Sequence, residues 1–204
     1  MIYVKLLGGL GNQMFQYAFG RYLAEIHGTE LAFDLTGLKN DENQDGRTRF
    51  ELDVFNVKGR FATADELFIF KRRTFAGLSL PVRVYKSLFG YSKISGPIFS
   101  YNESIVSASR KNTYLSGLFQ TEKYFSPIEN IIRSEFTFKN KPNSQNLKII
   151  NQIAEAFHSV AIQVRRGDYV SDPRYRDTIG ACDLEYYQNA ISLIKNKYSE
   201  ARFF

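Results

Sequence analysis

The sequence predicts an α/β fold built on parallel strands, and three observations support this prediction. Short apolar runs rich in β-branched residues are typical of buried strands, and they occupy residues 2–7, 31–35, 114–119 and 160–164. Apolar side chains recur at helical spacing in residues 12–27, 146–157 and 184–197. The first strand, the first helix and the second strand follow one another directly, as in a βαβ unit.

A glycine-rich loop, residues 8–11, joins the first strand to the first helix, which Asn12 is expected to cap. Such a loop before a helix N-terminus is a natural place for phosphate or another polar ligand group. The alternative is that the glycines only make a tight turn. Asp34 would complete a nicotinamide-dinucleotide fingerprint, but residues 9–14 lack the third glycine of the G-x-G-x-x-G pattern.

Two further helix starts are predicted from capping patterns in the middle of the chain. Thr63 and Glu66 have the spacing of a capping box, which opens a helix to about Arg73. Ser126 and Glu129 have the same spacing, with a proline between them at the first helical position. Both segments are therefore expected to be helical from their first turn.

The segments between these elements divide the chain. Residues 36–49 are polar and are expected to form an exposed loop, whereas residues 50–57 are expected to pack on the sheet. Residues 78–100 are aromatic and interrupted by proline and glycine, so they receive no assignment. Residues 138–145 have the composition of a linker. The sequence thus predicts one domain over residues 1–145 and a second over residues 146–204.

The strand at residues 160–164 leads directly to Arg165, Arg166, Gly167 and Asp168. Ligands of open α/β sheets bind at the carboxyl ends of the strands. Two adjacent guanidinium groups at such an end can offer forked donors to phosphate oxygens. Gly167 allows a sharp turn, and Asp168 can orient one arginine. The alternative is a surface turn with an internal Arg–Asp pair.

Composition excludes several other classes of protein. The chain has 204 residues, 44% of them apolar and 15% aromatic, which is typical of a globular protein. The net charge of +6 fits an anionic ligand or attraction to an anionic membrane surface, but no Lys/Arg run is long enough for a nucleic-acid arm. Cys182 is the single cysteine, and with two histidines it argues against a metal site.

The N-terminus enters a strand with no long apolar segment and no signal peptide. We therefore expect a cytoplasmic protein, with peripheral association at the inner membrane surface left open by the positive charge. The second domain would hold only one complete strand, and a parallel strand needs flanking partners to be buried. Either this unit packs wholly on the first, or the chain is part of something longer.

Five ordered blocks of this sequence resemble the α-1,2-fucosyltransferases of glycosyltransferase family 11. The first, GGLGNQMFQYAFG at residues 8–20, is similar to the family's N-terminal signature. The others are FELDVFNV at 50–57, LSGLFQTEKYF at 115–125, VRRGDYV at 164–170 and CDLEYY at 182–187. Together they span the chain, which is therefore identified as a member of this family, apparently shortened at its C-terminus.

The resemblance implies an inverting enzyme of the GT-B type, with two Rossmann-like units that face a cleft and a second unit that is incomplete here. Such an enzyme moves L-fucose from GDP-fucose to the 2-hydroxyl of a terminal galactose in a glycan, with no metal or other cofactor. The implied partners are GDP-fucose and a galactose-terminated acceptor, and no nucleic acid. The first unit would lie on the acceptor side, and the second would bind the GDP-sugar.

The resemblance also implies roles for particular residues. Arg165 and Arg166 match the arginines that hold the pyrophosphate of GDP and stabilise it as the leaving group, and Asp168 would position them. The implied donor-binding set is Gln163, Arg165, Arg166 and Gly167. The implied opposite wall of the cleft, near phosphate and acceptor, is Gly9, Gly11, Asn12 and Gln13. The general base is not identifiable from the sequence.

Gln163 departs from the family pattern, which has a histidine two residues before the first arginine. A glutamine can replace a neutral imidazole as a hydrogen-bond partner, but it cannot titrate. Two alternatives from other classes therefore remain. One is a non-catalytic, truncated remnant that binds nucleotide or glycan without transfer, and the other is a dinucleotide-dependent oxidoreductase.

Overall fold

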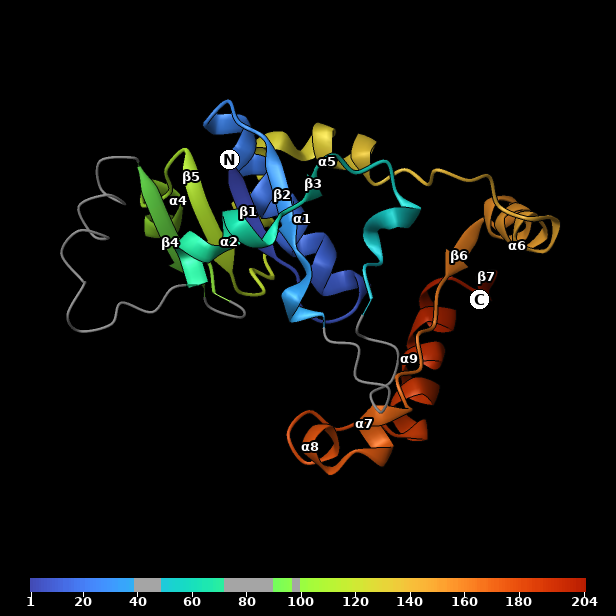
Figure 1. Cartoon of the computed structure of the whole chain (residues 1–204). Coiled ribbons are helices and arrows are strands. Elements are labelled where there is room, and N and C mark those ends of the chain that lie inside the picture. Colours follow the sequence, from blue (N-terminus) through green and yellow to red (C-terminus); the bar gives the residue numbers. More distant parts are fainter. Residues whose placement is uncertain (39–48, 72–89, 97–99) are drawn as a thin grey trace. The chain divides into compact units, whose positions relative to one another are not determined.

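A computed structural model describes residues 1–38, 49–71, 90–96 and 100–204. The chain divides into two units, Met1–Asn140 and Lys141–Phe204, and each is described by itself. Both contain helices and parallel strands (Figure 1), which confirms the predicted α/β class. Parts of two predicted segments, the loop at 36–49 and the helix end at Arg73, lie outside the described residues, as does much of the unassigned stretch at 78–100.

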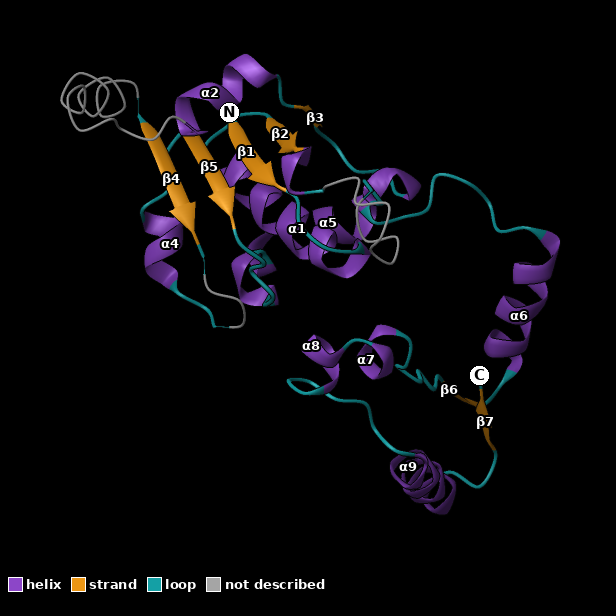
Figure 2. Cartoon of the chain, turned by 60° about the horizontal axis from the view of Figure 1, so that its bottom comes forward, coloured by secondary structure: helices purple, strands orange, loops and turns teal. Residues whose placement is uncertain are grey.

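The first unit is built on a five-stranded sheet in the order β3-β2-β1-β5-β4 (Figure 2). All four pairings are parallel. The strands are β1 (Ile2–Lys5), β2 (Leu31–Asp34), β3 (Arg60–Phe61), β4 (Tyr91–Ser95) and β5 (Asn112–Ser116). The predicted strands at residues 2–7 and 31–35 are confirmed, and the one predicted at 114–119 begins and ends earlier.

Successive side chains of β1 point to opposite sides of the sheet, so both faces are apolar. Helices cover each face. Ile2 and Val4 belong to the larger core, which is completed by α1 (Leu10–Ile26), α4 (Glu103–Ser107) and α5 (Glu129–Glu135). Tyr3 faces the other way and packs with Leu67 and Phe70 of α2 (Ala64–Lys71). Short 3₁₀ turns occur at Leu35–Gly37, Leu52–Val54, Glu122–Tyr124 and Ser126–Ile128.

Helix α1 lies close against β1 and is fastened to α5. A side chain at Gly20 would place its Cβ 2.3 Å from the Val4 side chain, so only glycine allows this approach. The Tyr17 hydroxyl donates to Glu135 of α5 at 2.5 Å, and Arg21 Nε donates to the same carboxylate at 3.1 Å. Burial, followed by this hydrogen bond, raises the pKa of Tyr17. These contacts fix the helix that follows the glycine loop.

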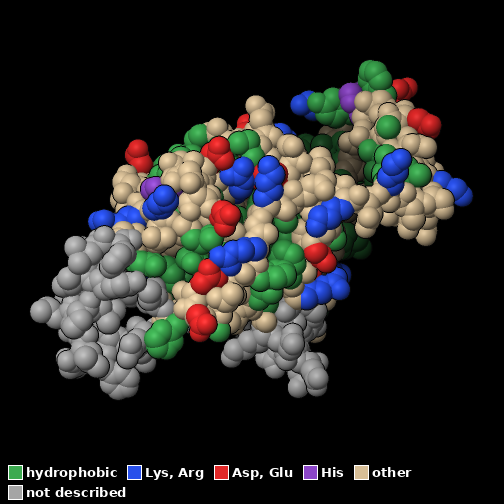
Figure 3. All heavy atoms as spheres, turned by 45° about the horizontal axis from the view of Figure 1, so that its top comes forward, with side chains coloured by type: hydrophobic (Ala, Val, Ile, Leu, Met, Phe, Trp, Pro, Cys, Tyr) green, Lys and Arg blue, Asp and Glu red, His purple; other side chains and the backbone are tan. Residues whose placement is uncertain are grey.

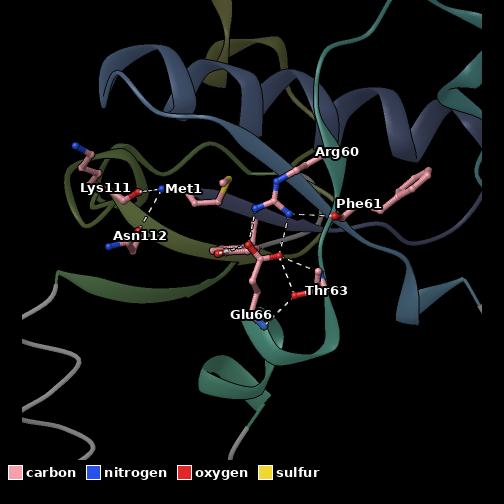
Figure 4. A network of polar contacts seen from close by, with 8 residues as sticks. Met1, Arg60, Phe61, Thr63, Glu66, Lys111 and Asn112 are labelled. Atoms are coloured by element: carbon pink, nitrogen blue, oxygen red, sulfur yellow. Dashed lines mark hydrogen bonds and ion pairs between the residues drawn. The ribbon is translucent and has the colours of Figure 1, made fainter.

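The capping box at the start of α2 is confirmed (Figure 4). The Thr63 amide donates to Glu66 Oε2 at 2.9 Å, and the Glu66 amide donates back to Thr63 Oγ1 at 3.3 Å. Arg60 also binds both carboxylate oxygens of Glu66. The hydrogen bonds from Arg60 and then from Thr63 lower the pKa of Glu66 to about 2. The Glu66 carboxylate therefore connects β3, through Arg60, to the start of α2, through Thr63.

Two predicted helix starts were wrong. Helix α1 begins at Leu10 with Gly9 in the cap position, so Asn12 already lies within the first turn and caps nothing. Its carboxamide instead accepts a hydrogen bond from Gln120. Ser126 lies in a 3₁₀ turn, and α5 begins only at Glu129, with no side-chain cap. The Asn12 side chain is thus bound by a residue distant in sequence, and the 3₁₀ turn directly precedes α5.

The second unit has short strands and separate helices. They are α6 (Ser144–Glu155), β6 (His158–Val160), α7 (Asp168–Ser171), α8 (Pro173–Arg176), α9 (Leu184–Lys197) and β7 (Ala201–Phe203). Strands β6 and β7 pair in parallel. The Asp183 carboxylate accepts from the Tyr186 amide at 2.8 Å, and α9 has the predicted bounds.

The prediction of a buried strand at residues 160–164 was wrong in length and in burial. Strand β6 ends at Val160, although backbone hydrogen bonds with Phe204 continue to Ile162. Among the side chains described for residues 141–204, none is buried. The expected inner face of α6 is open too, with Ile150 46% exposed. The physical reason is that two three-residue strands, the described sheet of this unit, cannot cover the helices' apolar faces.

Lys/Arg and Asp/Glu side chains are interspersed on the face of the molecule that Figure 3 shows. Ion pairs along helices include Arg21 with Glu25 and Arg133 with Glu129, both at 2.7 Å. No helix among the described residues is long and apolar enough to cross a membrane.

Candidate functional site

Three loops of the first unit leave the sheet at one edge. Strands β1 and β5 are parallel neighbours, and β4 pairs with β5, so their carboxyl ends lie side by side. The loop after β1 contains Gly8 and Gly9, the loop after β5 contains Gly117 to Gln120, and Gly96 follows β4. Ligands of open parallel sheets bind at this edge. The glycine loop is therefore in the position that the sequence predicted.

Two buried glutamines of α1 hold the glycine loop. Gln13 Nε2 donates to the carbonyls of Gly8 and Arg49, both at 2.9 Å, and its Oε1 accepts from the Glu51 amide at 2.9 Å. Gln16 accepts from the Leu7 amide at 3.0 Å and donates to the Leu7 carbonyl at 3.4 Å. Both side chains have no exposed surface. Gln13 therefore positions the loop, and its enclosed carboxamide does not face solvent.

Asn12 is held beside the same loop. Gly8 has a φ of 72°, in the left-handed region, and a side chain there would lie 2.3 Å from Asn12 Nδ2. Gln120, from the loop after β5, donates through Nε2 to Asn12 Oδ1 at 2.5 Å. Both side chains are half-buried. The structure thus joins two sequence blocks that are 108 residues apart through one pair of carboxamides.

Phe119, the residue before Gln120, has an unusual backbone conformation. Its φ is 51°, which is uncommon for a bulky residue and costs about 1–2 kcal/mol. Its ring is 1% exposed and packs 4.9 Å from the ring of Phe19 and 5.8 Å from that of Tyr124, measured between centroids. Any side chain at Gly96 would overlap this ring. Packing therefore compensates for the strain and fixes where Gln120 emerges.

The charged groups near the glycine loop include a carboxylate. Glu51 Oε2 lies 3.7 Å from the position that a Cβ of Gly9 would occupy. Its other oxygen is 3.6 Å from Arg49, whose side chain is 81% exposed. A Cβ built at Gly11, in the first turn of α1, would meet no other atom within 4 Å. The Glu51 carboxylate beside Gly9 is therefore paired with Arg49, and the two groups together carry no net charge.

Asp34 does not provide the ribose contact of a dinucleotide site. Its side chain is fully buried at the end of β2. Oδ1 accepts from the Thr36 amide at 2.9 Å, and Oδ2 accepts from the Tyr114 hydroxyl at 2.7 Å. Burial, followed by this hydrogen bond, raises the pKa of Tyr114. Both oxygens of the carboxylate thus accept hydrogen bonds within the protein. Asp34 is therefore not placed to bind a ribose, which argues against the oxidoreductase alternative.

The arginine segment of the second unit is accessible. Arg165, Arg166 and Gly167 are exposed, and Gly167 has a φ of 57° at the turn into α7. The Gly167 carbonyl accepts from the amides of Val170 and Ser171, both at 3.0 Å. The Arg165 guanidinium lies over the Tyr169 ring at 4.4 Å from its centroid, a cation–π contact. The side chain of Asp168 lies outside the described structure, so its contact with the arginines stays a prediction.

Gln163 lines a hollow of about 200 Å³ in the second unit. The hollow lies between the extended segment at 160–163 and α9, where Tyr187 and Ile191 contribute to it. Gln163 itself is exposed and comes two residues before Arg165. The segment thus places a neutral carboxamide and two guanidinium groups close together along the chain.

A larger hollow of about 530 Å³ lies at the opposite, amino-terminal edge of the first sheet. Its lining includes Arg21, Lys58 and Arg60. Each of these cations is near a carboxylate: Arg21 at Glu25 and Glu135, Lys58 3.8 Å from Glu135, and Arg60 at Glu66. The hollow is therefore not a ready anion site. Over the described residues, no three His, Cys, Asp or Glu side chains gather as metal ligands would.

Sequence reasoning missed three residues of the carboxyl edge: Gln16, Glu51 and Gln120. Gln16 lies on the buried side of α1, three residues after Gln13, so a polar residue in an apolar stripe was the available signal. Glu51 and Gln120 lie within the matched blocks, but their proximity to the glycine loop depends on the pairing of distant segments. The glycine loop belongs to the first unit and the arginine segment to the second.

The chain is similar to known glycosyltransferases. The family model for glycosyl transferase family 11 matches residues 87–204, more than half of the chain. An alpha-1,2-colitosyltransferase of Escherichia coli is 32% identical over 213 residues, covering 100% of this chain and 67% of its own length. The O-antigen biosynthesis glycosyltransferase WbnK of Escherichia coli is 30% identical over 214 residues, covering 98% and 70%.

A solved structure of a mutant of Arabidopsis thaliana FUT1 in complex with GDP is also similar, with a TM-score of 0.45 and 10% identity. The match covers 97% of this chain and 48% of the FUT1 chain. The family match and the curated relatives define a glycosyltransferase. The chain belongs to glycosyl transferase family 11.

Proposed function

We propose that this glycosyltransferase moves L-fucose from GDP-fucose to the 2-hydroxyl of a terminal galactose in a glycan. The observation that carries the proposal is the exposed Arg165–Arg166 pair at a glycine turn, within the segment that the family model matches. Two guanidinium groups suit a pyrophosphate, because each can donate two parallel hydrogen bonds to its oxygens. The relatives named as sugar transferases support the same reaction class.

The proposed step is a single inverting displacement. The galactose 2-hydroxyl oxygen forms a bond to C1 of fucose, the bond from C1 to the β-phosphate oxygen breaks, and GDP leaves with that electron pair. Negative charge develops on the leaving oxygen, where Arg165 and Arg166 would stabilise it. Removing one such donor typically costs about 10²–10³ in rate. The hydroxyl proton goes to a base that the described residues do not identify.

In this proposal Gln163 and Gly167 complete the donor side. Gln163 can offer both a donor and an acceptor to the nucleotide, and the hollow beside it lies next to the aromatic start of α9. Gly167 lets the chain turn without a side chain between the arginines and the ligand. Asp168 is proposed to orient the pair. The acceptor is proposed to bind at the carboxyl edge of the first sheet, near Gly9, Gly11 and Asn12.

A second donor is favoured by a specific observation, because one relative is named as a colitosyltransferase. Colitose lacks the hydroxyl that fucose carries on C3. A site that hydrogen-bonds a hydroxyl rejects the analogue without it strongly, whereas an apolar site discriminates by only about 10–200-fold. GDP-fucose and GDP-colitose should therefore give clearly different rates of transfer, whichever of them is the natural donor.

The test is a transfer assay with the purified protein, lactose as acceptor, and GDP-fucose or GDP-colitose as donor. We expect GDP and a glycosylated lactose in equal amounts, with the new linkage at the galactose 2-position by mass spectrometry and NMR. Product from GDP-colitose alone would show that the proposed donor is wrong and that the proposed reaction class is right. Binding of GDP with no product from either donor would favour the non-catalytic alternative.

A further inference from the structure

Asn12 and Gln120 form a carboxamide pair at the carboxyl edge of the first sheet. Asn12 lies in the first turn of α1, after β1, and Gln120 lies in the loop after β5. Because β1 and β5 are adjacent and parallel, both loops emerge at the edge where α/β proteins bind ligands. The Nε2–Oδ1 distance of 2.5 Å shows that the two side chains are directly joined.

The surroundings hold this pair in one geometry. Gly8 leaves the space that Asn12 Nδ2 occupies, and the buried Gln13 ties the Gly8 carbonyl to residues 49–51. On the other side, Phe119 is held at a strained φ of 51° immediately before Gln120. Strain of this kind persists only where packing over-determines it, and it is concentrated at ligand sites. Both carboxamides are thus preorganised while remaining half-buried.

The chemistry of the pair selects the class of ligand. Each carboxamide has two N–H donors and an acceptor oxygen. One donor of Gln120 is used within the pair, and the described residues provide no other hydrogen-bond partner to either side chain. Asn12 therefore offers donors and Gln120 offers an acceptor, as sugar hydroxyl groups require. The nearby Glu51 carboxylate is paired with Arg49, so this ion pair adds no net charge and the neutral carboxamides suit an uncharged ligand.

We propose that Asn12 and Gln120 together bind hydroxyl groups of the neutral acceptor sugar. This inference rests on the proposed function for the identity of the sugar, a terminal galactoside. It adds Gln120 to the predicted acceptor side. It also separates two roles within the glycine-loop block, because Gln13 and Gln16 position the backbone whereas Asn12 contacts the ligand.

The test is a titration of the 204-residue protein with methyl β-galactoside, followed by ligand-observed NMR. Asn12→Asp keeps an acceptor for Gln120 but removes both N–H donors, so the fold should be retained while binding weakens. Gln120→Met removes the pair. We expect about fivefold to tenfold weaker binding in each variant, the loss of about one hydrogen bond. Gln152→Met, at an exposed carboxamide on α6, is the matched control and should bind as the wild type does.

Three results would overturn the inference. They are no galactoside binding by the wild type, equal binding by wild type and both variants, or binding of inorganic phosphate that the same variants lose. Thermal unfolding of Asn12→Asp, expected near the wild-type midpoint, separates lost contacts from a lost fold. The titration needs no donor, so a failure of the transfer assay would contradict the proposed function and leave this result standing. If transfer occurs, the acceptor KM should rise in both variants while the donor KM stays unchanged.

Discussion

At the scale of single residues, Arg165 and Arg166 are adjacent in sequence but differ in their contacts. Arg165 lies over the Tyr169 ring, a contact worth about 0.5–1 kcal/mol at an exposed site, and this restricts where its guanidinium can point. Arg166 is exposed, and its carbonyl accepts from the Tyr169 amide at 3.2 Å. The pair is thus organised by the first turn of α7.

Replacing either arginine by alanine should weaken GDP binding by about tenfold to a hundredfold, because one charged hydrogen bond contributes about 1.5–3 kcal/mol. Isothermal titration of wild type, Arg165→Ala and Arg166→Ala with GDP measures this. Arg176→Ala is the control, since that exposed arginine lies on α8 and pairs with Asp177 at 2.9 Å. Unchanged affinity in both arginine variants would remove these residues from the donor site.

Gln163→His should preserve or raise transfer from the GDP-sugar. The substitution restores the residue type that the family pattern has before the two arginines, and a neutral imidazole offers the same donor and acceptor. Initial rates between pH 6 and pH 8 measure the effect, and the wild type should show no titration from this position. Loss of activity in Gln163→His at every pH would show that the two side chains have different roles.

Elements differ in how far the sequence could predict them. The caps at Thr63 and Asp183 were predictable, because the capping groups lie within three residues of the amides they bind. The hold of Gln13 on residues 49–51 was not, since that contact requires distant segments to meet. The strand expected at 160–164 was wrong because burial depends on neighbouring strands, which apolar pattern alone does not reveal.

The capping box of α2 should make stability depend on pH in acid. The pKa of Glu66 is lowered to about 2 from an ordinary value of 4.5, so its contribution is present above pH 4.5. It should be lost as the pH falls towards 2, where the carboxylate protonates. Glu66→Gln should cost about 1 kcal/mol at neutral pH and remove this part of the acid dependence.

Urea unfolding at pH 7, 4.5 and 2.5, followed by circular dichroism, measures both effects. Asp65→Asn is the control, because this exposed carboxylate lies in the same helical turn. A difference between wild type and Glu66→Gln that is equal at all three pH values would contradict the role given to the shared carboxylate.

The two units of the whole molecule differ in their cores. The first has a sheet with helices on both faces and many fully buried side chains, whereas the described side chains of residues 141–204 are all at least partly exposed. Hydrogen exchange should therefore be slow in β1 and β5 and markedly faster in β6 and α9, since local stability follows burial. Equal protection of β1 and α9 in a monomeric sample would contradict this difference.

Hydrogen exchange with and without GDP tests the central claim most directly, which is that the arginine segment holds the nucleotide. The amides of Tyr169, Val170 and Ser171 close the turn around Gly167, so a ligand bound there should slow their exchange. We predict that saturating GDP protects residues 163–171 and leaves residues 7–13, the glycine loop, unchanged. Protection of the glycine loop alone, or of neither segment, would contradict the account.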